Sequence, residues 1–426
     1  MEERLQFSAL KDALLYMAMC INLSNFRALN CYEERWTYGL GFVMLLFPQE
    51  TQGKKNADHW EGKMHSKLEI SDFIRPCLRD FAGVKPNKSI DLFSDKIPPK
   101  EILKLNANEN PYGCSPKVNR ALQECDNYHI YPDAGQNQIR EMLAAYTGLP
   151  SDQIVAGAGG EQIIDLLVRL FVDPRDEVIT CPPTFVFYDF STRLCGGIPV
   201  QVPRDEYFDI EVKKVLKAVT ERTKLIFLCN PNNPTGNMTS REDLLEIAKI
   251  GVPTVIDEAY YEYTGKTLAT MIAQYPNIMI IRTLSKWAGM AGFRMGYGLF
   301  TAKIAASLRT IKPPFSVSVP AQIALKASLE DKGPLLETVK KVIRERDRLF
   351  QAMREIDFLK PYPGYGNFLF CDLLEGDAAQ LTGSLEGKGI LVRHYNVPGL
   401  RRGIRISVGT REANDKLLFA LREWGK

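Results

Sequence analysis

The sequence predicts an α/β fold with a mostly parallel central sheet flanked by helices, followed by a smaller α+β part. Between about residues 134 and 300, short apolar β-branched runs alternate with helix-length amphipathic stretches and with loops rich in Gly, Pro and Asn. Strands that alternate with helices are typical of a parallel sheet covered on both faces. After about residue 335 the pattern changes to a charged helix, short strands and a closing helix.

The individual elements follow from local patterns. In the first part, the expected strands include the β-branched runs 177–181, 224–229, 253–256 and 278–281. The stretch Thr239-Ser-Arg-Glu242 is a capping-box pattern that opens a helix with an apolar stripe at Leu244, Leu245, Ile247 and Ala248. In the second part we expect a helix over 336–355, strands near 368–371, 390–392 and 404–408, and a helix over 412–424.

The length of 426 residues predicts two or three domains. We expect a large domain over 131–330 and a C-terminal small domain over 331–426. Residues 1–63 lack a clear period and precede a methionine, Met64. They are interpreted as a loosely ordered extension or as an artefact of start-codon choice, and in either case as not needed for activity.

Composition excludes several classes of protein. Lys and Arg number 54 against 51 Asp and Glu, and no basic block stands out, so nucleic acid is not an expected partner. No segment approaches the ~18–20 apolar residues that cross a bilayer, and the start lacks a signal-peptide pattern. We therefore expect a cytoplasmic protein without a membrane partner.

The distribution of cysteine and histidine argues against a disulfide framework and against a metal site. The nine cysteines are widely spaced and include no Cys-x-x-Cys, which favours reduced thiols over a disulfide framework or a zinc site. The four histidines do not cluster, so we expect no metal site.

Polar residues follow several of the expected strands, where ligands bind in open α/β sheets. Asn233 lies in the turn Asn-Pro-Asn-Asn-Pro-Thr-Gly, and Asp257 ends the next strand. Taken alone, Asn233 could be a structural turn residue and Asp257 a helix N-cap. Lys286 follows the third strand, beside Ser285 and ahead of Arg294 in a glycine-rich loop.

These residues together indicate a phosphorylated aldehyde cofactor. A partly neutral Lys286 amine can form an imine with an aldehyde. Ser285, Arg294 and the glycine-rich helix start at 157–160 can bind a phosphate. Asp257 can pair with a protonated ring nitrogen. Pyridoxal phosphate needs this combination of lysine, carboxylate and phosphate cup.

The same residues resemble the fold-type I aminotransferases, and most closely their histidinol-phosphate aminotransferase branch. The resemblance covers roughly residues 68–424. Besides the sites above, it rests on Leu105-Asn-Ala-Asn-Glu-Asn-Pro-Tyr-Gly113, Tyr131-Pro-Asp133, Asp257-Glu-Ala-Tyr260 and Arg405-Ile-Ser-Val-Gly-Thr-Arg411. It implies a large cofactor-binding domain and a small domain built from N- and C-terminal segments, with residues 64–130 as an N-terminal arm and part of that small domain.

The resemblance also implies roles around the cofactor ring. Lys286 would be the lysine that binds the cofactor, and Asp257 would pair with the pyridine nitrogen. Asn233 and Tyr260 would hydrogen-bond the ring hydroxyl. Phe185 would stack on the ring face, where many relatives carry Tyr.

The phosphate would be held by the helix start and the lysine loop, through Gly160, Glu161, Gln162, Ser285 and Arg294. The family commonly has Ser or Ala followed by Asp-Glu at the helix start. The departures at Gly160 and Gln162 matter little if the contacts are backbone N–H groups.

The remaining implied roles concern the substrate and a second subunit. Tyr131 would reach the phosphate of a neighbouring subunit, which implies a homodimer with shared active sites. Arg405 would bind the α-carboxylate of glutamate, and Arg393 the side-chain phosphate or carboxylate. Tyr112 and Asn367 would line the substrate pocket. For Arg405 and Arg393 a structural ion pair is the alternative, and for Tyr112 plain packing.

The implied reaction transfers an amino group between histidinol phosphate or imidazole acetol phosphate and glutamate or 2-oxoglutarate, a step of histidine biosynthesis. A threonine-phosphate decarboxylase and an aromatic amino acid aminotransferase share most of these motifs and stay open as alternatives. A transcription regulator with an N-terminal DNA-binding domain is disfavoured, because residues 1–63 carry seven Lys and Arg against eight Asp and Glu. A catalytically silent relative is disfavoured by the intact lysine, aspartate and arginine set.

Overall fold

The computed structural model describes residues 69–79, 81, 83, 97–98 and 101–425. By its internal contacts the chain divides into two units, Met1–Ile74 and Arg75–Lys426. In the first unit, the short helix η1 (Ile70–Phe73) has Glu69 as its N-cap, and the Glu69 N–H donates a hydrogen bond to the carboxylate of Asp72 inside the helix at 3.1 Å. The interpretation of residues 1–63 falls outside the described residues.

The second unit is built on a seven-stranded sheet with the strand order β2-β8-β7-β6-β5-β3-β4. Neighbouring strands run parallel except at β8, which is antiparallel to both of its neighbours. The predicted mostly parallel sheet is therefore confirmed. The strands are β2 (Ile154–Ala158), β3 (Glu177–Thr180), β4 (Ile198–Gln201), β5 (Thr223–Cys229), β6 (Thr254–Asp257), β7 (Ile278–Thr283) and β8 (Met295–Leu299).

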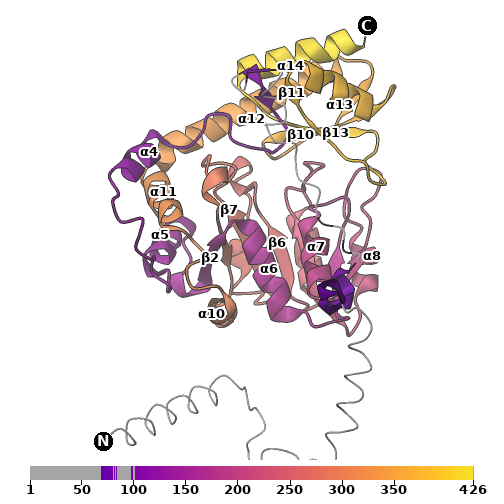
Figure 1. Ribbon diagram of the computed structural model, residues 1–426. Helices are drawn as coiled ribbons and strands as arrows, with labels where there is room; N and C mark the ends of the chain where they lie inside the picture. The colour runs from indigo at the N-terminus through magenta and orange to yellow at the C-terminus, as the bar shows by residue number, and fades with distance from the viewer. Residues whose placement is uncertain (1–68, 80, 82, 84–96, 99–100, 426) are drawn as a thin grey trace, which may run out of the picture. The chain divides into compact units, whose positions relative to one another are not determined.

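Both faces of this sheet are buried. In β7, Ile278 and Ile280 belong to one hydrophobic cluster while Met279 and Ile281 belong to another, as alternation along a strand requires. Residues of α6 (Gly160–Phe171), α7 (Phe187–Leu194) and α10 (Ala302–Ile311) share the second cluster, and α6 crosses in front of the strands in Figure 1. The first cluster contains residues of α4 (Pro116–Gln123), α5 (Asn137–Thr147), α8 (Val212–Ala218), α9 (Arg241–Ala248) and α11 (Val319–Glu330).

A second, antiparallel sheet of four strands has the order β12-β13-β10-β9. These strands are β9 (Leu359–Pro361), β10 (Phe368–Leu373), β12 (Arg393–His394) and β13 (Gly403–Ser407), and α13 (Ala378–Gly387) and α14 (Arg411–Trp424) pack with them. Beside them, β1 (Leu103–Lys104) pairs in parallel with β11 (Ile390–Leu391). A segment from early in the chain thus lies against the C-terminal part, at the top of Figure 1.

One helix takes part in both cores. In α12 (Lys332–Arg354), Leu335, Val339 and Val342 lie in a cluster of the large sheet. Towards its C-terminal end, Leu349 and Met353 lie in the cluster of the second sheet. The apolar positions recur at helical spacing, so one face of this helix is covered along its length.

Three expected elements differ in the structure. The cap of α9 is Ser240, whose hydroxyl accepts a hydrogen bond from Asp243 N–H at 3.0 Å, and not Thr239. The helix expected over 336–355 begins earlier, at Lys332. The glycine-rich loop after Lys286 contains β8, a fully buried strand. A Cβ at Gly296 would lie 2.4 Å from the carbonyl carbon of Gly159, so glycine is needed there for close strand packing and not for a loop.

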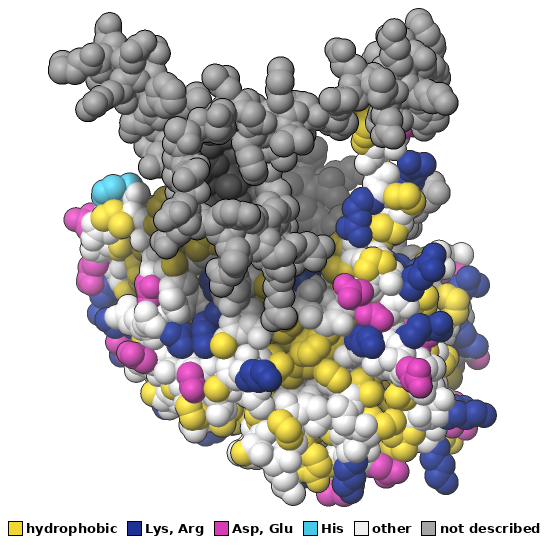
Figure 2. Space-filling model, turned by 90° about the horizontal axis from the view of Figure 1, so that it is seen from below, with side chains coloured by type: hydrophobic (Ala, Val, Ile, Leu, Met, Phe, Trp, Pro, Cys, Tyr) yellow, Lys and Arg dark blue, Asp and Glu magenta, His cyan; other side chains and the backbone are white. Residues whose placement is uncertain are grey.

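The described residues contain no disulfide, no cluster of metal ligands and no helix that could span a membrane. The seven described cysteines are free, and no group of His, Cys, Asp or Glu in that part of the chain is arranged to hold a metal ion. Across residues 69–425, gaps aside, no helix has the length and apolar character to cross a bilayer. On the face shown in Figure 2, acidic and basic side chains are interspersed among hydrophobic ones.

Candidate active site

The carboxyl ends of three neighbouring parallel strands bring the predicted residues together. Cys229 at the end of β5 is in register with Asp257 at the end of β6, which is in register with Ile281 in β7. Asn233 lies in the turn after β5, and Lys286 lies three residues beyond β7. Because parallel strands end at one edge of the sheet, these side chains converge there.

They meet in a cavity of about 490 Å³. Ten of the residues singled out from the sequence line it: Gly160, Glu161, Phe185, Asn233, Asp257, Tyr260, Ser285, Lys286, Arg294 and Arg405. Its wall also contains residues from the segment before α4, including Asn108. The cavity therefore draws on both sheets and on an early part of the chain.

Lys286 reaches this cavity with its side chain partly buried. Its Nζ donates a hydrogen bond to the carbonyl oxygen of Ala107 at 3.1 Å, and Tyr263 Oη donates to the Lys286 carbonyl at 3.2 Å. Burial, followed by repulsion from Arg405, lowers the pKa of Lys286 to about 8. A fraction of the amine is therefore neutral, and nucleophilic, near physiological pH.

Asp257 is a buried carboxylate held by neutral donors. Its Oδ2 accepts a hydrogen bond from Tyr188 Oη at 2.6 Å and its Oδ1 accepts one from Ala259 N–H at 3.0 Å. Burial raises its pKa to about 6. The adjacent Glu258 is equally buried but pairs with Arg282 at 2.9 Å, whereas no cation of the described residues pairs with Asp257. This carboxylate is suited to a cationic ligand group.

The amino end of α6 forms the third part of the site. Gly159 precedes it with φ +83°, and a Cβ there would lie 2.4 Å from an Arg294 Nη atom. Arg294 Nη2 pairs with Glu161 at 2.7 Å, and Thr283 Oγ1 donates to Ser285 Oγ at 2.9 Å. A helix start, a guanidinium and the Ser285 hydroxyl provide the donors that a phosphate requires.

Arg405 enters the cavity from the second sheet. On β13, it donates from Nη1 to Asn233 Oδ1 at 2.6 Å and from Nη2 to the Asn106 carbonyl at 2.7 Å. Its Nε is buried, and no acceptor for it lies among the described residues. Tyr260, also buried, has its pKa raised by burial and accepts a hydrogen bond from Asn108 Nδ2 at 2.9 Å.

Comparison with known proteins identifies the family. Residues 100–421 match the family described as aminotransferase class I and II. The chain belongs to this family.

Individual relatives agree with that assignment. A histidinol-phosphate aminotransferase of Dehalococcoides mccartyi (strain CBDB1) is 49% identical over 84% of this chain and 99% of its own length. A chloroplastic histidinol-phosphate aminotransferase of Arabidopsis thaliana is 40% identical, covering 83% of this chain and 86% of its own length. The crystal structure of a histidinol-phosphate aminotransferase from Sinorhizobium meliloti, in complex with pyridoxal-5'-phosphate, is similar with a TM-score of 0.75 at 26% identity, covering 85% of this chain and 99% of that one.

Five predicted site residues of this class I and II aminotransferase lie off the cavity wall. Gln162 instead accepts a hydrogen bond from Ala158 N–H at 2.7 Å, and Asn367 is buried and donates to the Asn108 carbonyl at 2.9 Å. Tyr112 is 37% exposed, and Tyr131 is 77% exposed with its ring stacked on Phe315 at 4.4 Å.

Arg393 is the fifth of these residues. It lies on β12, in register with Arg405 on β13, with its guanidinium 5.5 Å from the ring of Tyr395. It lines a separate cavity of about 340 Å³ that also includes Asn106. The two arginines of this aminotransferase therefore share a strand pair and the ring of Tyr395, although they line different cavities.

Sequence reasoning assigned no role to three consecutive residues that the structure places in the site. Asn106 binds Arg405, Ala107 binds Lys286 and Asn108 binds Tyr260. Two of these three contacts use backbone carbonyls, which carry no side-chain signal. Only the motif Asn-Ala-Asn, quoted for the family resemblance, pointed to this segment of the aminotransferase.

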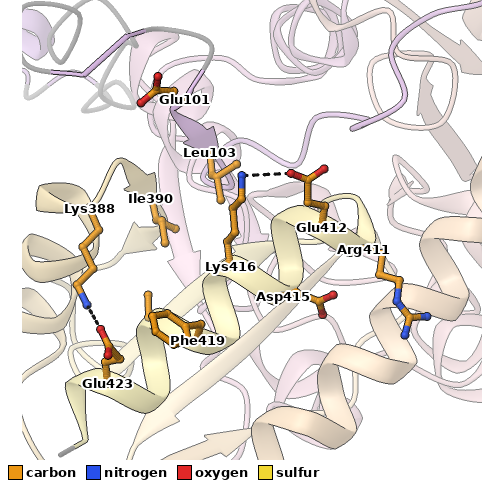
Figure 3. Close-up of a pocket in the computed structure, with 11 residues that line it drawn as sticks. Glu101, Leu103, Lys388, Ile390, Arg411, Glu412, Asp415, Lys416, Phe419 and Glu423 are labelled. Carbon is orange, nitrogen blue, oxygen red and sulfur yellow. Dashed lines mark hydrogen bonds and ion pairs between the residues drawn. The ribbon is translucent and has the colours of Figure 1, made fainter.

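A larger cavity, of about 830 Å³, lies elsewhere in the aminotransferase, against α14 and the β1–β11 pair. Figure 3 shows two ion pairs along it, Lys388 with Glu423 at 3.2 Å and Lys416 with Glu412 at 3.2 Å. Its apolar lining includes Leu103, Ile390 and Phe419. It contains no buried titratable group like Lys286 or Asp257, so the smaller cavity is the candidate active site despite its size.

Proposed function

We propose that this chain transfers an amino group between histidinol phosphate or imidazole acetol phosphate and glutamate or 2-oxoglutarate, with pyridoxal phosphate as cofactor. One observation carries the proposal. A partly buried amine with a lowered pKa and a buried carboxylate without a cationic partner in the described chain lie on the wall of one cavity, at Lys286 and Asp257. The identity to relatives of that activity supports the choice of substrate.

The residues present fit the cofactor. The Lys286 amine is placed to bind its aldehyde, and Asp257 offers the negative charge that a protonated ring nitrogen requires. Gly160, Glu161, Ser285 and Arg294 would hold its phosphate, with Gln162 contributing a backbone N–H. When bound, pyridoxal phosphate supplies a ring that accepts electrons from the substrate's α-carbon.

The chain's own groups would then perform five tasks. Asp257 keeps the ring nitrogen protonated, and Phe185 packs on the ring face. Asn233 and Tyr260 hydrogen-bond the ring hydroxyl. Arg405 binds the substrate α-carboxylate, using its fork of donors. Lys286 would act as the general base that moves the proton from the substrate's α-carbon.

The predicted site residues that lie off the cavity wall are assigned to a second subunit and to the rest of the substrate. We infer a homodimer in which the exposed Tyr131 reaches the phosphate bound by a second copy. Tyr112, Asn367 and Arg393 are proposed to bind or support the rest of the substrate. We further propose the domain limits 64–130, 131–330 and 331–426, and a cytoplasmic location.

The test is a transamination assay. Purified protein with added pyridoxal phosphate is incubated with histidinol phosphate and 2-oxoglutarate, and glutamate formation is followed with the absorbance of the cofactor. Glutamate formation that is lost in Lys286→Ala supports the proposal. If the protein binds the cofactor but forms glutamate only from aromatic amino acids, the substrate is an aromatic amino acid. If it releases CO₂ from threonine phosphate, the activity is that of a threonine-phosphate decarboxylase. Absence of a cofactor band would overturn the proposal as a whole.

A further inference from the structure

Asn108 is held by residues from three distant parts of the chain. Its Nδ2 donates to Tyr260 Oη at 2.9 Å, and its Oδ1 accepts a hydrogen bond from Ser407 Oγ at 3.0 Å. Its backbone N–H donates to Ser407 Oγ at 2.7 Å, and its carbonyl accepts from Asn367 Nδ2 at 2.9 Å. Asn108 is 1% exposed and lies on the cavity wall. The Oδ1 end of the amide thus faces Ser407 and the Nδ2 end faces Tyr260.

The direction of the bond to Tyr260 leaves one proton available. A phenol has one O–H donor and can also accept a hydrogen bond. Since Asn108 supplies the proton in its contact with Tyr260 Oη, the phenol keeps its own proton for another acceptor. Among the described residues, no hydrogen bond uses that proton. Tyr260 itself lines the cavity.

We propose that Asn108 is a positioning residue that turns the Tyr260 hydroxyl into the cavity, where it donates to the ring hydroxyl oxygen of the cofactor. This inference rests on the proposed function, in which Tyr260 binds that oxygen. A phenol that accepts a hydrogen bond is polarised and becomes a stronger donor. Asn108 thereby stabilises negative charge on the ring oxygen through Tyr260.

The backbone of Asn108 offers an alternative reason for this residue. Its φ is +53°, a left-handed conformation in which Asn is enriched. Glycine adopts that conformation without strain but has no amide side chain. Asn108→Gly therefore removes the hydrogen bond to Tyr260 but keeps the left-handed backbone conformation. Asn108→Asp keeps the size but replaces the donor by an acceptor, which would draw the phenol proton away from the cavity.

The experiment uses the cofactor-loaded full chain without substrate. The pH midpoint of the cofactor's absorbance change reports how well negative charge on the ring oxygen is stabilised, because a donor to that oxygen favours the deprotonated form. We expect Asn108→Gly to raise the midpoint by roughly half a pH unit to one unit, the size of a single hydrogen bond. Asn108→Asp should raise it at least as far.

The matched control is the same change in a Tyr260→Phe background. Because Asn108 acts through the phenol, Asn108→Gly should produce no further shift there. An equal shift in both backgrounds, or no shift with Tyr260 present, overturns the inference. Should Asn108→Gly fail to fold by circular dichroism, Asn108→Asp carries the same comparison. If the wild-type protein shows no cofactor band, the proposed function fails; if the band is present and only the shift is missing, this inference fails alone.

Discussion

Lys286 and Asp257 share one cavity, yet burial moves their pKa values in opposite directions. The pKa of Lys286 falls to about 8 and that of Asp257 rises to about 6. Burial disfavours the charged form of each group, which lowers the pKa of an amine and raises that of a carboxylic acid. Above pH ~8 the two groups are both in the form that the proposed chemistry uses, a neutral amine and a charged carboxylate.

The pKa of Lys286 predicts how the apoprotein captures its cofactor. Only the neutral amine attacks an aldehyde, so the rate constant for pyridoxal phosphate capture should rise with pH and level off above about pH 8. An unperturbed lysine would keep gaining neutral amine up to its ordinary pKa near 10.4. Stopped-flow absorbance across this range measures the rate. A rate that still climbs steeply at pH 10 would contradict the lowered pKa.

The Tyr188 hydroxyl is predicted to support the charge on Asp257. Tyr188→Phe removes the 2.6 Å hydrogen bond but keeps the ring that stacks on Phe227 at 4.7 Å. The pKa of Asp257 should then rise further, and cofactor affinity should fall roughly tenfold, as for loss of a hydrogen bond to a charged group. The loss should be larger at pH 6 than at pH 8, in equilibrium titrations followed by absorbance. A pH-independent or absent effect would assign Tyr188 to packing alone.

At the scale of elements, the cap of α9 distinguishes two adjacent hydroxyls. Ser240 accepts a hydrogen bond from the helix, while Thr239 Oγ1 is buried without a partner among the described residues. A capping side chain satisfies an N–H group that the helix cannot pair internally.

We therefore expect Ser240→Ala to lower the free energy of unfolding by about 1 kcal/mol, the usual value of an N-cap. The matched control is Thr239→Val, which keeps the shape and removes a hydroxyl that makes no hydrogen bond in the described structure. It should cost nothing or be slightly stabilising. Urea unfolding of both variants provides the measurement. A larger loss of unfolding free energy in Thr239→Val than in Ser240→Ala would instead support Thr239 as the cap.

Particular residues show how far the sequence could predict these elements. The buried strands β5 to β7 are continuous apolar runs, and the polar residues that follow them were found because strand ends attract ligands. β8 was missed because Gly296 and Gly298 resemble loop residues, although they allow close packing against Gly159 and Phe300. Ala107 could not be found, since its contact with Lys286 uses a carbonyl that every residue has.

At the scale of the whole described unit, α12 links the two hydrophobic cores. At 23 residues it is about 34 Å long at 1.5 Å per residue, enough to pack against the large sheet at one end and the second sheet at the other. A substitution that destabilises one end of this continuous helix should therefore destabilise both cores.

Met353→Ala tests this coupling. Loss of this fully buried side chain should reduce the free energy of unfolding by roughly 2–4 kcal/mol. Hydrogen exchange should become faster in β10 and, through α12, in β7 as well. The exposed neighbour Gln351→Ala is the control and should change little. Faster exchange confined to β10 would show that the two cores unfold independently.

The contacts of Asn106 and Asn108 also bear on the order in which the protein folds. Their partners Arg405 and Ser407 are 299 residues further along the chain. Contacts of such sequence separation form slowly, because a long loop must close before they stabilise anything. The sheet that carries Asp257 and Lys286 joins residues much closer in sequence. We expect the lysine and the carboxylate to be in place early in folding, and the cavity to gain its remaining wall only when early and late parts of the chain have met.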